Sequence, residues 1–218
     1  MTLSNQPPKG TADWFPEEFQ IRKYIFDTWR SVCVRYGYRE YLTPLVESAE
    51  IYRAKSGEDI GGKELMSFFD QAGRELSIRP EMTPSVTRLV SQIYDAQPKP
   101  IRYFSIANFM RNEKPQRGRN REFWQLNVDI FGSKSQSSEL EMLQMALDIV
   151  LAFNPPKYSF ILCLNHRQLI EGLMSMVSPD PTMKQGIVRL MDKWQKMSWV
   201  DFSSALKELG VDASGLET

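Results

Sequence analysis

The sequence predicts an α/β (α+β) protein in which a mostly antiparallel sheet is flanked by helices. Strand patterns at residues 101–109 and 122–131 are joined by a charged loop, which is typical of an antiparallel pair. Apolar residues at helical spacing occupy residues 16–36, before these strands, and residues 138–150, after them. This order of helices and strands favours a sheet that is covered by helices.

The N-terminal third is expected to contain one long helix and one strand. Residues 16–36 begin with Pro-Glu-Glu, which suits a helix N-terminus, and Gly37 ends the helix. Residues 39–47 follow as a strand. Pro44 lacks an amide donor, so it belongs at an edge, a bulge or an interface. Three glycines among the charges of residues 55–62 predict a mobile loop.

The middle of the chain carries a hairpin and two helix starts. The turn of the hairpin is expected near residues 70–73. Thr83 and Pro84 predict a helix start, with a hydroxyl at the N-cap and proline at the first helical position. Ser138 and Glu141 have the spacing of a capping box, which opens the helix before the next strand.

The C-terminal part combines a strand with three helices. The apolar run at residues 158–164 predicts a strand, and Asn165 turns into a helix that ends near residue 177. The Ser-Pro-Asp-Pro sequence at residues 178–181 breaks both helix and strand and predicts a domain boundary. Beyond it, residues 184–196 and 199–209 are expected to form a helical hairpin.

Composition narrows the classes of function. The chain has 27 Lys and Arg residues and 27 Asp and Glu residues, so its formal net charge is zero. A protein without net positive charge does not attract nucleic acid over long range, so any contact with RNA must be local. Cys33 and Cys163 lack metal-ligand spacing and are expected to be buried free thiols in a reducing cytosol. No stretch approaches the ~18 apolar residues of a membrane span. We therefore expect a cytoplasmic protein with no membrane partner and no metal held by its own side chains.

The strand at residues 122–131 alternates strictly between its two faces. An amide, a second amide and a carboxylate, spaced two residues apart, share one face, and burying them against an apolar core is unfavourable. This face is interpreted as the floor of a polar pocket. Its residues are Phe123, Gln125, Asn127, Asp129 and Phe131, and the opposite face carries Trp124, Leu126, Val128 and Ile130.

The loop before this strand is strongly basic. Guanidinium groups match phosphate oxygens and neutralise charge during transfer at phosphorus, so one interpretation is a clamp for a polyphosphate. A solvated, charged hairpin tip is the other, and the residues alone leave the two open. Neither a Walker loop nor GxGxxG is present, so a nucleotide site here must be of another type. The loop carries Lys114, Arg117, Arg119 and Arg121, flanked by Arg111 and Glu113.

The stretch FMRNEKPQRGRNREFWQLNVDIFG, residues 109–132, resembles motif 2 of class II aminoacyl-tRNA synthetases, and its P-Q-x-G-R-x-R-x-F loop is similar to that of histidyl-tRNA synthetases. The resemblance implies that Arg111 binds the α-phosphate of ATP and the substrate carboxylate. It also implies that Glu113 binds the adenine amino group, Arg119 the γ-phosphate side, and that Phe123 stacks on adenine.

Residues 79–84, Arg-Pro-Glu-Met-Thr-Pro, are similar to the R-P-E-x-T segment of bacterial-type histidyl enzymes. The resemblance implies that Glu81, Thr83 and Gln125 hold the α-amino group of histidine and that Asp129 reaches its imidazole. The Asn-Val-Asp sequence that ends at Asp129 is more similar to this segment of archaeal and eukaryotic histidyl-tRNA synthetases. A bacterial or an archaeal affinity therefore stays open.

Residues 36–47 are similar to motif 1, which builds the class II dimer interface, so Pro44 is expected at a homodimer interface. The opening Gly-Thr-Ala-Asp-Trp at residues 10–14 resembles the family's Gly-x-x-Asp start. The resemblance extends to about residue 176 and continues more loosely into an inserted helical domain. His166, the single histidine, is interpreted as a capping or packing residue.

Taken together, the resemblance implies a histidine–tRNA ligase that uses ATP and Mg²⁺, with histidine and tRNA(His) as partners in the complete enzyme. Residues 1–177 are expected to be a partial catalytic domain with motifs 1 and 2, and residues 178–218 the start of a helical insertion. Motif 3 and an anticodon-binding domain do not occur, so the chain is expected to be an incomplete catalytic fragment. The alternatives are a non-catalytic regulatory paralogue, like the subunit that partners ATP phosphoribosyltransferase, and a dimerisation remnant.

Overall fold

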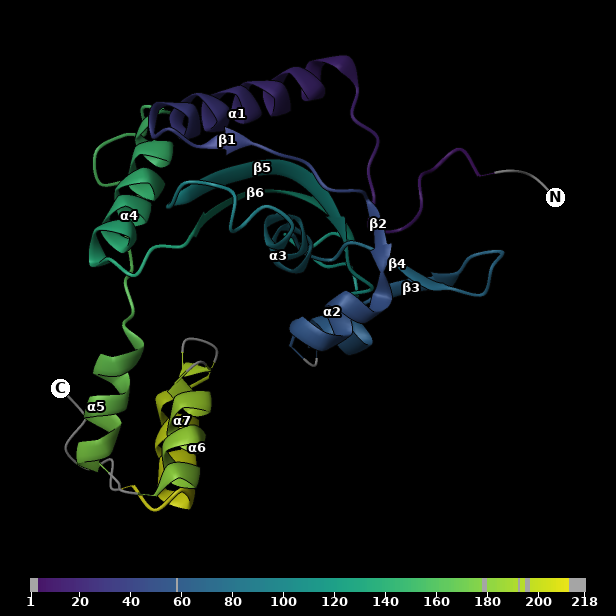
Figure 1. Ribbon diagram of the computed structural model, residues 1–218. Helices are drawn as coiled ribbons and strands as arrows, with labels where there is room; N and C mark the ends of the chain where they lie inside the picture. Colours follow the sequence, from purple (N-terminus) through teal and green to yellow (C-terminus); the bar gives the residue numbers. More distant parts are fainter. Residues whose placement is uncertain (1–3, 58, 178–179, 192, 195–196, 212–218) are drawn as a thin grey trace. The chain divides into compact units, whose positions relative to one another are not determined.

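The structure is a computed structural model that describes residues 4–57, 59–177, 180–191, 193–194 and 197–211 (Figure 1). The chain divides into two compact units, and the division lies between Ser159 and Phe160. None of the described helices is long and apolar enough to cross a bilayer. The assignment of residues 1–177 and 178–218 to two domains stays a prediction, and part of its boundary lies outside the described residues.

The first unit is built on a three-stranded sheet in the order β1-β5-β6. Strands β5 (Ile101–Met110) and β6 (Glu122–Phe131) are antiparallel and pair over their whole length, from Ile101 opposite Phe131 to Met110 opposite Glu122. Strand β1 (Arg39–Glu40) adds a short parallel pair at the other side of β5. Both long strands and their antiparallel pairing are confirmed.

A second sheet is smaller and fully antiparallel, in the order β2-β4-β3. It contains β2 (Val46–Ser48), β3 (Met66–Phe69) and β4 (Glu75–Ile78). The predicted turn is confirmed, since the Gly73 amide donates to the Asp70 carbonyl at 3.0 Å with Gly73 at a φ of 76°.

The single strand predicted for residues 39–47 is wrong, because the chain changes sheets within this segment. The Tyr41 amide still donates to the Phe104 carbonyl of β5 at 2.9 Å. Beyond Pro44, which has no amide to donate, the Leu45 carbonyl accepts from the Arg79 amide at 3.0 Å, next to the second sheet. The segment around Pro44 is therefore the crossover between the two sheets.

Helices cover both faces of the first sheet (Figure 1). Helices α1 (Pro16–Arg35) and α4 (Gln136–Leu151) pack on one face and α3 (Thr83–Ser91) on the other. The apolar positions of β6 divide between these cores as the alternation predicts. The α1–α4 core is centred on Val32, Cys33, Tyr38, Phe104 and Met145, and the α3 core on Met82, Val86, Val90, Tyr103 and Phe109.

Both predicted helix caps differ from those observed. Helix α3 begins at Thr83 itself, after Met82 and without a side-chain cap, so Thr83 is not the N-cap. Helix α4 is capped by Ser135, whose hydroxyl accepts from the Ser137 amide at 3.2 Å. Glu141 forms no capping box because its carboxylate pairs with the Arg102 guanidinium of β5 at 2.8 Å, a charge-assisted bond between elements.

The mobile loop predicted at residues 55–62 is replaced by helical structure. Helix α2 (Ala49–Lys55) leads into a π-helical turn, η1 (Asp59–Lys63). A Cβ on Gly61 would lie 2.9 Å from the Tyr52 carbonyl oxygen, so a glycine is required for this close backbone approach. Gly61 therefore serves packing, whereas a Cβ on Gly57 or Gly62 would meet nothing within 4 Å.

The strand predicted for residues 158–164 is absent. A strand needs a neighbour for its backbone hydrogen bonds, and no described segment pairs with this run. Its large apolar side chains are exposed, from 101% for Tyr158 to 37% for Phe160. Cys163 is exposed as well, which corrects the expectation that both thiols are buried; Cys33 is buried as expected.

The second unit contains three helices, α5 (Arg167–Val177), α6 (Pro181–Met191) and α7 (Trp199–Glu208). The Nδ1 atom of His166 accepts from the Leu169 amide at 3.3 Å, which confirms its capping role. Helices α6 and α7 form the predicted hairpin, and they share a small core of Ile187, Phe202 and Leu206.

Candidate active site

The basic loop between β5 and β6 folds back on itself as a tight hairpin. Gln116 and Arg119 exchange two backbone hydrogen bonds of 3.1 and 2.9 Å around Gly118, whose φ of 79° favours glycine. At the base of the loop the Arg111 amide donates to the Arg121 carbonyl at 2.9 Å. This fold returns Arg119 toward the end of β5, where Arg111 lies.

The hairpin borders a cavity of about 420 Å³. Four of its lining residues are those predicted to bind the nucleotide; three come from the loop that follows β5 and Phe123 comes from β6. The segment after η1 closes another side, held by a hydrogen bond of 2.8 Å from the Asn112 amide to the Glu64 carbonyl. The lining consists of Arg111, Glu113, Arg119 and Phe123 with Ile60, Glu64, Gly118 and Asn120.

Sequence reasoning missed the wall formed by Ile60 and Glu64. These residues lie about fifty positions before the loop, in a segment whose glycines suggested a mobile loop. Their nearness to the basic hairpin depends on tertiary contacts. The sequence offers no chemical signal for them.

The charged groups of the cavity are paired with one another. The Glu113 carboxylate lies 3.2 Å from Arg119 Nη1 and 3.8 Å from Arg111 Nη1. Arg111 is further held by a bond of 3.1 Å from its Nε to the Pro80 carbonyl, and its guanidinium lies 5.0 Å from the centre of the Phe123 ring. Arg119 has a side chain that is 63% exposed, so its ion pair contributes only about 0–1 kcal/mol. Arg111 is thus fixed, while Arg119 can change partner at little cost.

The residues predicted to hold the amino acid fall into two pairs. Glu81 and Thr83 border a separate cavity of about 450 Å³, where the Glu81 carboxylate accepts from the Ser56 hydroxyl. Gln125 and Asp129 lie on the face of β6 that meets α3, and they do not line this cavity. The structure therefore brings all four predicted nucleotide residues into one cavity lining, whereas of the predicted amino-acid residues only Glu81 and Thr83 share one.

Asp129 belongs to a group of buried polar side chains. Burial raises the pKa of its carboxyl group to about 6, partly offset by the nearby Tyr41 hydroxyl. Its Oδ2 atom has no hydrogen-bond partner in the described part of the chain. The same holds for Tyr41 Oη, Ser105 Oγ and Asn127 Nδ2. Sequence reasoning missed Tyr41 and Ser105, which carry no motif of their own.

Comparison with known proteins identifies the family. The family model of histidyl-tRNA synthetase matches residues 10–215. A curated histidine–tRNA ligase of Leptospira biflexa is 45% identical over 197 residues, which cover 90% of this chain and 45% of that protein. The chain belongs to the histidyl-tRNA synthetase family. A second relative, the histidine–tRNA ligase of Pyrococcus furiosus, is 37% identical over 209 residues, covering 96% of this chain and 47% of the relative. The chain thus spans about half the length of these relatives.

Solved structures share the fold. A Bacillus halodurans protein, described as an ATP phosphoribosyltransferase regulatory subunit/histidyl-tRNA synthetase, superposes with a TM-score of 0.80 at 23% identity, over 97% of this chain and 54% of that one. The histidyl-tRNA synthetase of Nostoc gives 0.77 at 19% identity, over 94% and 47%. At this level of identity the likeness concerns the fold alone, and it confirms the α/β architecture.

In this histidyl-tRNA synthetase family member, the N-terminal segment supports the motif 2 loop. The Gly10 carbonyl accepts from the amides of Arg121 and Glu122 at 2.8 and 3.0 Å. Gly10 has a φ of 91°, and a Cβ there would lie 2.8 Å from Arg121 Cγ and 2.9 Å from Pro115 Cγ. The Gly-x-x-Asp start of the family therefore has a physical role, because only glycine allows this contact with the loop.

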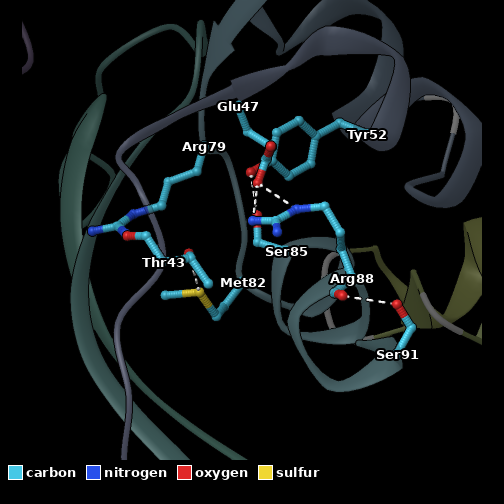
Figure 2. A network of polar contacts seen from close by, with 8 residues as sticks. All are labelled: Thr43, Glu47, Tyr52, Arg79, Met82, Ser85, Arg88 and Ser91. Carbon is cyan, nitrogen blue, oxygen red and sulfur yellow. Dashed lines mark hydrogen bonds and ion pairs between the residues drawn. The ribbon is translucent and has the colours of Figure 1, made fainter. Parts of the chain in front are cut away.

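The motif 1 segment is tied to the neighbouring strand and helix by a polar network (Figure 2). The buried guanidinium of Arg79 donates to the carbonyls of Thr43 at 2.8 Å and Asn108 at 2.9 Å. Arg88 of α3 pairs with Glu47 at 2.6 Å. Pro44, between these anchors, is exposed, as a residue of a dimer interface must be in a single chain. Its place in an interface stays a prediction.

No cluster of three or more His, Cys, Asp or Glu side chains that could hold a metal occurs among the residues that the structure describes. Within the lining of the cavity beside the basic hairpin, Glu64 and Glu113 carry carboxylates. Mg²⁺ commonly binds through one or two carboxylates, several waters and the phosphates of its substrate. The cavity therefore fits a magnesium ion that arrives with a nucleotide.

Proposed function

We propose that this chain supplies the ATP side and part of the histidine side of a histidine–tRNA ligase active site. The observation that supports this best is the single cavity lined by Arg111, Glu113, Arg119 and Phe123. Aminoacyl-tRNA synthetases generally use ATP and Mg²⁺. The proposed reaction is the joining of histidine and ATP to histidyl-adenylate and pyrophosphate, followed by transfer of the histidyl group to the 3′ end of tRNA(His).

The assigned chemistry is positioning and charge stabilisation. Arg111, held by Pro80 and packed over Phe123, contacts the α-phosphate and the carboxylate of histidine. Since that carboxylate is already ionised, it attacks the α-phosphorus without a general base. Phe123 stacks on adenine. Two guanidinium groups in one cavity match the charge that spreads over the phosphate oxygens.

Nucleotide binding is proposed to proceed by partner exchange. Arg119 leaves its exposed pair with Glu113 and takes the γ-phosphate side. Glu113 is then free to accept a hydrogen bond from the adenine amino group. Because the pair that breaks is weak, the exchange costs little. With Glu113 taken by adenine, the Glu64 carboxylate of the cavity lining would hold Mg²⁺ together with the phosphates, and the ion would supply charge neutralisation there.

For the amino acid, we assign Glu81, Thr83 and Gln125 to the α-amino group and Asp129 to the imidazole. Asp129 has the strongest support of the four, because its buried carboxylate has an oxygen without a partner in the described part of the chain. Glu81 has to release the Ser56 hydroxyl or share its carboxylate with the ammonium group. The ammonium is the stronger donor of the two.

We further propose a homodimer that forms through the exposed segment around Pro44, anchored by the Arg79 and Glu47 contacts. Residues 1–177 are assigned to the catalytic domain and residues 178–218 to the start of its helical insertion. Light scattering tests the dimer. A strictly monomeric chain at micromolar concentration would remove Pro44 from an interface.

The test of the function is ATP–pyrophosphate exchange with each of the twenty amino acids, together with calorimetry of ATP·Mg²⁺. We expect exchange with histidine alone, at a rate far below that of the twice-longer relatives, because motif 3 does not occur in these residues. Preference for proline or threonine would refute the substrate. Histidine binding without ATP binding would instead favour the regulatory paralogue, which the retained arginines of the cavity argue against.

A further inference from the structure

Four polar side chains on one face of the first sheet converge in an unusual way. The backbone places them next to one another: Ser105 of β5 is opposite Asn127 of β6, and Asp129 is opposite Tyr103. Tyr41 continues β1 beside them, since its amide donates to the Phe104 carbonyl at 2.9 Å. Alternate residues of a strand share a face, so all of these side chains meet the α3 side of the sheet.

The described part of the chain has five buried side-chain polar atoms without a hydrogen-bond partner. Four of the five belong to this cluster, from Tyr41, Ser105, Asn127 and Asp129. A buried polar group normally finds a partner, and leaving one unpaired is costly. Gathering four in one place, between well-packed residues such as Ala107 and Phe109, indicates a polar site in which Tyr41 can pair with Asp129 and a ligand supplies the remaining partners.

We propose that Tyr41 is a specificity-determining residue of the histidine subsite, where its hydroxyl donates to Asp129 and aims that carboxylate at the imidazole N–H. This inference rests on the proposed function. It adds Tyr41, which belongs neither to motif 2 nor to the R-P-E-x-T segment, to the residues of the histidine subsite. A neutral imidazole offers one N–H donor and one acceptor nitrogen. Asp129 accepts from the first, and the Asn127 amide donates to the second.

The surroundings of Tyr41 suit this role. Burial raises the pKa of its hydroxyl strongly, so the group remains a donor at neutral pH. The charged groups that act on it are Asp129 and Arg79. Its ring lies 5.8 Å from the Tyr103 ring, which is in turn covered by the Arg39 guanidinium at 5.3 Å. The ring is thus held by packing, and a phenylalanine at this position keeps that packing while losing the hydroxyl.

The experiment compares Tyr41→Phe with Tyr38→Phe. Tyr38 is the control, because it is a buried tyrosine on the opposite face of the sheet and donates to Glu141 at 2.9 Å, whereas Tyr41 is partly buried. Calorimetry measures histidine and ATP·Mg²⁺ separately, and carboxyl-carbon NMR measures the pKa of Asp129. We expect Tyr41→Phe to weaken histidine binding about tenfold, to raise the pKa of Asp129 and to leave ATP affinity unchanged.

Each other outcome has a definite meaning. Equal histidine affinity in Tyr41→Phe and the wild-type chain overturns the inference, even if the pKa of Asp129 rises. An equal loss in Tyr38→Phe overturns it too, since the effect would then be general to buried tyrosines. A wild-type chain that binds ATP but not histidine refutes the subsite and leaves the nucleotide site standing, whereas one that binds neither refutes the proposed function itself.

Discussion

The cavity beside the basic hairpin and the polar face beneath α3 are built from opposite kinds of polar chemistry. In the cavity, the charges of Arg111, Glu113 and Arg119 satisfy one another, partly exposed to water. On the α3 face, uncharged groups and one carboxylate with a raised pKa are buried and lack partners among the described residues. In the cavity, water can solvate a charged group while it changes its ion-pair partner, so the change costs little free energy. On the α3 face, water is excluded, so a polar group without a hydrogen-bond partner destabilises the fold until a ligand supplies that partner.

Arg79 stands between the two regions, so its loss should produce the largest effect. Its guanidinium holds Thr43 and Asn108, and it lies 5.4 Å from the Phe109 ring. Arg79→Met leaves several buried acceptors without a donor. We expect the free energy of unfolding to fall by about 4 kcal/mol, measured by urea denaturation.

The control for Arg79→Met is Arg88→Met, which removes the partly exposed ion pair between Arg88 and Glu47. It should cost only about 1 kcal/mol. Equal losses for the two variants would show that burial does not distinguish these guanidinium groups.

Arg111→Ala tests the fixed charge of the cavity. Because this guanidinium is already oriented by Pro80 and Phe123, it needs little reorganisation to meet a phosphate. We expect ATP·Mg²⁺ affinity to fall on the order of 10²-fold in calorimetry. Arg117→Ala on the same loop is the control, since Arg117 is exposed and outside the cavity lining. Similar losses for both would mean that the loop acts through its total charge.

The buried face should make stability depend on pH in an unusual direction. The folded Asp129 carboxyl has a pKa of about 6, above its ordinary value of 3.8, so between about pH 4 and 6 it keeps a proton that the unfolded chain has released. The free energy of unfolding therefore falls as the pH rises through this window, by about 2 kcal/mol.

Asp129→Asn should remove this slope and stabilise the chain at pH 7, which thermal unfolding across the pH range would show. Asp70 gives a contrast of opposite sign. Hydrogen bonds from Arg74 lower the pKa of its carboxyl group, so its contribution is lost as the pH falls. An unchanged slope in Asp129→Asn would place the titrating group elsewhere.

Gly10→Ala should have the smallest effect, and it tests whether the cavity depends on its N-terminal support. The added Cβ meets Arg121 and Pro115 and strains a positive φ, so the loop shifts. We expect a loss of about 1 kcal/mol in stability and a few-fold weaker ATP binding. Gly37→Ala is the control, because Gly37 also has a positive φ but its Cβ would meet nothing within 4 Å. ATP binding that is weakened in both variants would point to strain alone.

Local patterns in the sequence were enough for the long elements. Strands β5 and β6, helix α1 and the α6–α7 hairpin follow from periodicity, because their apolar faces repeat over many residues. Short elements were harder. The segment around Pro44 divides between two sheets, and the apolar run at residues 158–164 forms no strand, since both outcomes depend on which neighbour is present to pair.

The sequence by itself determined the motif 2 hairpin, and with it the gathering of Arg111, Glu113, Arg119 and Phe123, because an antiparallel pair brings the two ends of a short loop together. Only the tertiary structure decided that Glu64 closes that cavity, that Gly10 supports the loop, and that Tyr41 lies near Asp129. These contacts link segments far apart in the chain. No local pattern in these residues indicates which distant segment each one contacts, so packing alone decides these contacts.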